Sequence, residues 1–155
     1  MKLSKNLSLY EVLISQTAKR LGISNKPTKK HLYNLEQIAL NIFQPLRDGL
    51  GVPIYVSSGY RSEELNKAIK GSSKTSQHLK GQALDLDADV YGKVSNADIF
   101  NYIKDNLDFD QMIWEGGNDK TPNWVHVSFK EGKNRGKLLK MVRVNGKSIY
   151  KAFDL

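Results

Sequence analysis

The hydrophobic and polar positions change from a helical period to a strand period along the chain, so helices are expected first and a sheet afterwards. Apolar residues recur at helical spacing over residues 9–21 and again over residues 32–43. Ser8 and Glu11 form a capping box before the first stretch, and Gly22 follows it as a stop signal. The sequence therefore predicts one helix that ends at Gly22.

A second helix is expected to open at Pro27 and Thr28. Pro45 should kink or restart this helix, because proline has no backbone N–H and its ring clashes with the preceding turn. Gly49 and Gly51 are the expected end of the helical region.

The rest of the chain alternates between short β-rich segments and capped helices. The predicted strands cover residues 54–58, 83–87, 111–115 and 124–129, and the predicted helices cover residues 63–69 and 97–106. A last pair of strands, within residues 138–152, flanks Asn145-Gly146, which is typical of a hairpin with a type I′ turn. Neither repeats nor a linker interrupt the chain. We expect one α+β domain over residues 1–155, with helices packed on a small antiparallel sheet.

Composition narrows the kinds of site that the chain can build. There is no cysteine among the 155 residues, so a metal site has only histidine and carboxylate ligands available. Twenty-four Lys and Arg against sixteen Asp and Glu give a net charge of +8. Such a charge fits a soluble basic surface, an anionic cell envelope or nucleic acid. No known nucleic-acid motif stands out, so a nucleic-acid partner is not expected.

The N-terminus has no apolar run of the kind found in a secretory signal, and no segment approaches the roughly 20 apolar residues of a membrane span. We therefore expect a protein that is cytoplasmic as synthesised. We also expect it to be a monomer. An action on the cell wall would then need release from the cell, or a place in a phage component.

Three residues carry the candidate chemistry. His78 and Asp85 lie seven positions apart on either side of Gly81, which permits a sharp reversal of the chain. Asp85 and His126 each occupy the polar face of a strand whose other face is apolar. A core histidine bonded to a structural aspartate would give the same pattern, but a divalent cation would offset the cost of burying the carboxylate. Together the three side chains could hold a zinc ion and leave its fourth position open.

The segment from Ser76 to Asp85 reads Ser-x-His-x-x-Gly-x-Ala-x-Asp. It resembles the signature of the zinc D-alanyl-D-alanine carboxypeptidases and dipeptidases, which the phage L-alanyl-D-glutamate endolysins share. Residues 57–62 and 124–128 are similar to two further elements of this family, and the resemblance runs over about residues 32–129. It implies a hedgehog-like zinc peptidase fold and one zinc ion per chain.

The resemblance also implies roles for single residues. His78, Asp85 and His126 would be the zinc ligands. Arg61 would hold a substrate carboxylate or the developing oxyanion, for which a guanidinium fork is suited. Ser76 would bond the substrate backbone, and Trp124 is expected to contact substrate.

One position departs from the family pattern. Many members have a carboxylate three residues before the last histidine, where it serves as general base, and this chain has Asn123 there. Glu115, at the end of the preceding strand, is the expected substitute, because antiparallel pairing would bring it near His126. Asp119, in the intervening loop, is the other candidate.

Two hypotheses of function follow from the sequence. The first is a zinc metallopeptidase that hydrolyses peptide bonds in peptidoglycan, as a carboxypeptidase or as an endolysin-type endopeptidase, with the stem peptide as its partner. The second is an inactive relative that binds zinc and wall peptide or a protein partner. Asn123 is the feature that favours the second.

Overall fold

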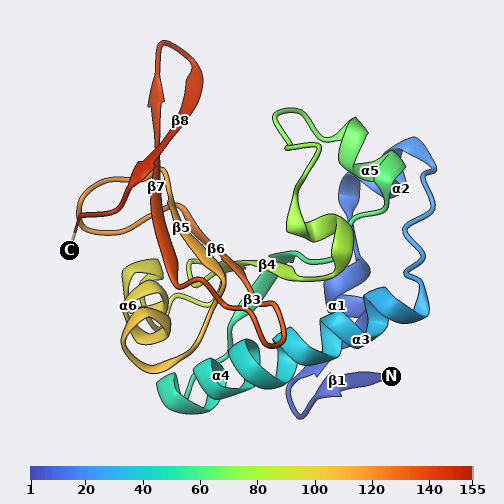
Figure 1. Cartoon of the computed structure of the whole chain (residues 1–155), viewed down its shortest axis with the longest axis horizontal. Helices are drawn as coiled ribbons and strands as arrows, with labels where there is room; N and C mark the ends of the chain where they lie inside the picture. The colour runs from blue at the N-terminus through green and yellow to red at the C-terminus, as the bar shows by residue number, and fades with distance from the viewer. Residues whose placement is uncertain (155) are drawn as a thin grey trace.

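The computed structural model describes residues 1–154 and has an α+β fold in which helices pack against one face of a six-stranded sheet (Figure 1). The sheet order is β3-β4-β6-β5-β7-β8. Its strands are β3 (Tyr55–Ser58), β4 (Ala83–Asp87), β5 (Gln111–Glu115), β6 (Trp124–Ser128), β7 (Lys137–Val144) and β8 (Lys147–Ala152). The helices are α1 (Leu9–Leu13), α2 (Gln16–Leu21), α3 (Lys29–Ile38), α4 (Gln44–Leu50), α5 (Glu63–Ala68) and α6 (Asn96–Asn106). The predicted fold class is confirmed.

Three further short elements complete the chain. A π-helical segment, η1 (Ala39–Phe43), joins α3 to α4, and a 3-10 turn, η2 (Gln77–Lys80), precedes β4. Strands β1 (Lys2–Ser4) and β2 (Leu7–Ser8) form a separate two-stranded sheet that the sequence did not predict. Within residues 1–154, no helix is long and apolar enough to cross a membrane.

The two faces of the six-stranded sheet differ in chemistry. Inward side chains of β3, β4, β5 and β6 join side chains of α3, η1, α4 and α6 in one core. The members from these four strands are Val56, Leu84, Leu86, Met112, Trp114, Val125 and Val127. Because side chains alternate along a strand, the residues between these point to the opposite face. The core thus fixes which face remains for polar chemistry.

One strand pair in the sheet is parallel, where an antiparallel sheet was expected. Strand β7 runs parallel to β5, from Gln111 opposite Lys137 to Glu115 opposite Met141, and the other four strand pairs are antiparallel. The chain leaving β6 passes the start of β5 before β7 begins. There the fully buried carboxylate of Asp110 accepts hydrogen bonds from the backbone and side chain of Arg135. This clamp holds the crossover in place.

The prediction of a single first helix is wrong. The helix breaks at Ile14, whose backbone is extended, and Ser15 caps α2 by accepting a hydrogen bond from the backbone N–H of Ala18. Since a serine hydroxyl can replace the missing intrahelical partner, the chain turns here without leaving that donor unpaired. The predicted capping box at Ser8 and the end at Gly22 are both present.

The second helix is irregular just before Pro45, as predicted, but the chain stays helical from α3 through η1 into α4. The backbone N–H of Gln44 bonds to the carbonyl of Ala39 in a π turn, and α4 then runs to Leu50. The predicted end is confirmed at Gly51, which caps α4 in the left-handed conformation, whereas Gly49 lies inside α4. A Cβ on Gly49 would lie 2.0 Å from the Tyr102 hydroxyl, so this glycine permits the close approach of α4 and α6.

The predicted strands over residues 83–87 and 111–115 match β4 and β5, and the capping box of α6 is present. The strand after residue 123 is confirmed as β6, and the last two strands form the predicted hairpin, Lys137–Ala152, with positive φ at both Asn145 and Gly146. We call this pair of strands the C-terminal hairpin.

A substitution at Gly81 tests how tightly the turn between η2 and β4 is packed. Its φ is +72°, and a Cβ there would lie 2.7 Å from the carbonyl oxygen of His31. Gly81→Ala should therefore lower the free energy of unfolding by at least about 1 kcal/mol more than Gly92→Ala, which has a similar φ of +70° and open space around it. Denaturant unfolding measures both. Equal losses would contradict the close packing of η2 on α3.

Candidate metal centre

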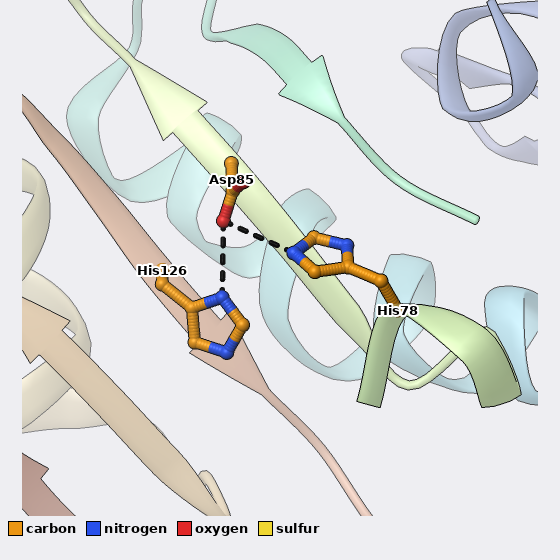
Figure 2. A group of neighbouring side chains, drawn as sticks. All are labelled: His78, Asp85 and His126. Carbon is orange, nitrogen blue, oxygen red and sulfur yellow. Dashed lines mark hydrogen bonds and ion pairs between the residues drawn. The ribbon is translucent and has the colours of Figure 1, made fainter. Parts of the chain in front are cut away.

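Two paired strands bring a carboxylate and an imidazole together. Asp85 of β4 lies directly opposite His126 of β6, so both side chains point to the same face of the sheet. We call this face, which also carries Glu115, the site face. The Nδ1 atom of His126 lies 3.0 Å from Oδ1 of Asp85 (Figure 2). The pairing register alone therefore places two of the three predicted ligands.

His78 reaches the same carboxylate from η2. Its Nε2 atom lies 3.2 Å from Oδ1 of Asp85, the same oxygen that the ring of His126 contacts (Figure 2). Its Nδ1 atom lies 2.6 Å from the carbonyl oxygen of Gly59 and must donate, because a carbonyl only accepts. Ser76 caps η2 by accepting from the backbone N–H of His78. The imidazole is thus held with its Nε2 aimed at Asp85.

The arrangement fits a metal ion. With Nδ1 donating to Gly59, a neutral His78 has a lone pair on Nε2, which then faces an oxygen that also only accepts. Burial lowers the pKa of His78, so the neutral ring is the favoured form. Two acceptors in contact repel one another unless a cation lies between them. All three ligand atoms lie within 4.8 Å of one another.

The donor set also agrees with zinc. Two imidazole nitrogens and one carboxylate oxygen are the ligands of many catalytic zinc sites. Neighbouring ligand atoms of a tetrahedral zinc ion lie about 3.3 Å apart, given bonds of about 2.0–2.1 Å. The two distances from Asp85 Oδ1, 3.2 and 3.0 Å, are close to this value.

Asp85 is ionised in this setting. Burial by itself would raise its pKa, but positive charge beside it, on the two imidazole rings or on a cation held among the three side chains, outweighs burial and holds the pKa well below its usual range. The guanidinium of Arg61 lies 3.5 Å from Oδ2, the other oxygen of the Asp85 carboxylate. The Nε–H of Arg61 donates a hydrogen bond to the hydroxyl of Ser58. Arg61 therefore pairs with the buried carboxylate and orients it.

Glu115 lies at the same site, as the sequence predicted. It is 6 % exposed, lies opposite Trp124 in the pairing of β5 with β6, and borders the same cavity as the three candidate ligands. Burial raises its pKa to about 7. The charge of Asp85 adds to this rise, and His126 opposes it. A carboxyl group with this pKa can accept and return a proton near neutral pH.

The other candidate bases lie elsewhere. Asp119 is exposed in the loop between β5 and β6, and its carboxylate pairs with Lys140 at 2.8 Å. Asn123 is also exposed, and its backbone N–H bonds to the carbonyl of Glu115. Of the carboxylates that the sequence singled out as bases, only Glu115 is at the site.

The cluster opens into a cleft of about 890 Å³, which Ser76 and Trp124 also line. Its far wall is one that the sequence analysis did not find: Met141, Arg143, Ser148 and Tyr150 of the C-terminal hairpin. No local signal marks these residues, because their position depends on the parallel pairing of β7 with β5.

Comparison with known proteins agrees with this geometry. The family described as Peptidase M15 matches residues 5–128, about four-fifths of the chain. The match extends further toward the N-terminus than the stretch 32–129 that the motifs suggested. A comparison with curated protein sequences gives no match. The matched residues contain the His-Asp-His cluster, the donor set of a zinc site. The chain therefore belongs to the M15 family of zinc-dependent peptidases.

Proposed function

We propose that this protein is a zinc-dependent metallopeptidase that hydrolyses peptide bonds of bacterial peptidoglycan. The observation that carries the proposal is the combination, in one cleft, of a three-ligand cluster with a buried carboxyl group whose pKa is raised to about 7. The signature from Ser76 to Asp85 supports peptidoglycan as the substrate, because it is similar to that of wall peptidases. The net charge of +8 is also compatible with an anionic envelope.

The residues of the cleft divide the chemistry among them. A zinc ion held by His78, Asp85 and His126 would act as a Lewis acid toward the scissile carbonyl and make water a better nucleophile. Glu115 takes a proton from the attacking water as the C–O bond forms. It then gives this proton to the amine as the C–N bond breaks, so it returns to its starting state. Its raised pKa suits both transfers.

The other predicted residues bind and orient the substrate. Arg61 presents a guanidinium group beside the cluster and would hold a substrate carboxylate or the developing oxyanion. Ser76 and Trp124 also line the cleft, where the hydroxyl would bond the peptide backbone and the indole would pack on it. The family resemblance suggests these roles, and the positions of the residues at the cleft support them.

A second candidate function rests on Asn123, which occupies the position of the usual family base. A relative that binds wall peptide without cutting it would keep the cluster and the cleft. Purified peptidoglycan separates the two: the zinc-loaded protein should release peptide fragments detectable by mass analysis, and a chelator should abolish the release. Binding to peptidoglycan without any release would support the second function.

The ligand assignment predicts one zinc ion per chain. His78→Ala and His126→Ala should each lose the bound zinc, because an ion left with two ligands binds far more weakly. Elemental analysis of the purified proteins measures this. His31→Ala is the matched control, since this third histidine serves the cap of α3 and should leave the zinc content unchanged. Full zinc content in His78→Ala or His126→Ala would contradict the assignment.

Glu115→Gln removes the proton acceptor and preserves the shape of the side chain. We expect the variant to keep its zinc and to lose at least about 10²-fold in the rate of peptide hydrolysis. Asp119→Asn, in the exposed loop, should retain the rate of the unmodified protein. If Glu115→Gln were fully active, another group would have to accept the proton.

The raised pKa of Glu115 also predicts a pH dependence of stability in the metal-free protein. The folded pKa of about 7 lies above the ordinary value of 4.5, so the folded state binds this proton more tightly than the unfolded state does. The contribution of Glu115 to stability is therefore lost as pH rises from about 4.5 to 7. Relative to the unmodified protein, Glu115→Gln should become more stable over this range, by up to about 3 kcal/mol. Denaturant unfolding across pH tests this, and a constant difference would contradict it.

A further inference from the structure

The site face continues beyond the catalytic cluster into the C-terminal hairpin. Met141 of β7 lies opposite Glu115 of β5 on one side and opposite Tyr150 of β8 on the other. Arg143 and Ser148 form the next pair on the same face, and all of these residues border the cleft. The family match ends at residue 128, so this wall is built by a part of the chain outside the matched region.

The hairpin is cationic throughout. It contains no acidic residue and five basic residues, which are Lys137, Lys140, Arg143, Lys147 and Lys151. Alternation separates them by face: Arg143 points to the cleft, and Lys147, which neighbours Ser148, points away from it. Arg143 is therefore the cation that the outer half of the hairpin presents to the site.

Arg143 has no acidic partner among residues 1–154, whereas two neighbouring cations do. Arg135 pairs with Asp110 and Lys140 with Asp119, but no carboxylate within ion-pair distance faces Arg143. Tyr150 is the diagonal neighbour of Arg143 across the hairpin, since it pairs with Met141, two positions before Arg143, and both residues line the cleft. An unpaired guanidinium beside an aromatic ring at the rim of a cleft is suited to a bound anion.

Two of the guanidinium groups that line the cleft, those of Arg61 and Arg143, lie toward opposite edges of the sheet. Arg61 follows β3, the strand at one edge, and Arg143 lies on β7 next to the other edge (Figure 1). The Arg61 guanidinium lies beside Asp85 on β4, and β7 is three strand spacings away, about 14 Å. Arg143 also lies four residues further along β7 than Leu139, the residue level with Asp85, which adds about 13 Å along the strand and makes the backbone separation about 20 Å. An extended peptide of five residues spans roughly 17 Å, and the long side chain of Arg143 can bridge the remainder, so one peptide can contact both arginines.

We propose that Arg143, with Tyr150 beside it, forms a specificity subsite that binds a carboxylate of the peptide substrate on the side of the cleft opposite Arg61. The inference rests on the proposed function, since it assumes a peptide in the cleft. The C-terminal hairpin thereby selects acidic peptides, and the direction of the bound chain is set by two cations rather than one. Since Arg143 is exposed, its contribution to binding is expected to be about tenfold.

Binding to the metal-free protein tests this without hydrolysis. The probe is the stem pentapeptide L-alanyl-γ-D-glutamyl-L-lysyl-D-alanyl-D-alanine, compared by calorimetry with two analogues, each with one of its two free carboxylates amidated. Arg143→Gln should weaken binding of the unmodified peptide about tenfold. One of the two amidations should weaken binding to the unmodified protein by a similar factor and have no further effect on Arg143→Gln. Lys147→Gln, a cation of the same hairpin on the other face, is the matched control and should bind normally.

Three results would overturn the subsite: unchanged binding by Arg143→Gln, an equal loss in Lys147→Gln, or full additivity of both amidations with Arg143→Gln. An equal loss in Lys147→Gln would mean a diffuse attraction of the hairpin for any polyanion. The rate of peptide cleavage by the zinc-loaded protein distinguishes a failure of the proposed peptidase function from a failure of the Arg143 subsite. Binding that depends on Arg143 without cleavage would refute the peptidase and leave the subsite standing. Cleavage at the same rate with and without Arg143 would support the peptidase and refute the subsite.

Discussion

The buried carboxylate of Asp85 is the constraint on which the rest of the site depends. An ionised carboxylate on a strand inside the protein is costly unless opposite charge and donors surround it. Here one oxygen faces His78 and His126, and the other faces Arg61. A neutral His78 points a lone pair at Oδ1 of Asp85, which also only accepts. The repulsion between these two acceptors is removed only when a cation lies among the three side chains. Metal binding and the stability of this region are therefore coupled.

A few backbone features place the histidine side chains around the Asp85 carboxylate. The register of β4 with β6 puts His126 opposite Asp85, and the turn at Gly81 returns the chain so that His78 reaches the same oxygen. The carbonyl of Gly59 then fixes which nitrogen of His78 is free, as outer-shell hydrogen bonds commonly do at metal sites. On the opposite face of the same strands, leucine and valine side chains pack against helices, so the sheet cannot slip without moving the site.

Much of this arrangement was predictable, because it depends on short-range patterns. Alternation placed Asp85 and His126 on polar strand faces, Asn145-Gly146 specified the hairpin turn, and antiparallel pairing put Glu115 beside the cluster. The break at Ile14 was missed because the apolar stripe continues through it, while the hydroxyl of Ser15 decides the local geometry. The parallel pairing of β7 with β5 was missed because it joins segments distant in sequence, and with it the place of the C-terminal hairpin beside the cleft.

The most direct test of the account is the position of zinc in a crystal, measured by anomalous diffraction at the zinc edge. The account predicts one strong peak that contacts Nε2 of His78, Nδ1 of His126 and the carboxylate of Asp85, at about 2.0–2.2 Å from each. The Nδ1 atom of His78 should remain bonded to the carbonyl of Gly59. A fully loaded protein with its peak at any other place, or ligation through the other nitrogen of either histidine, would contradict the account.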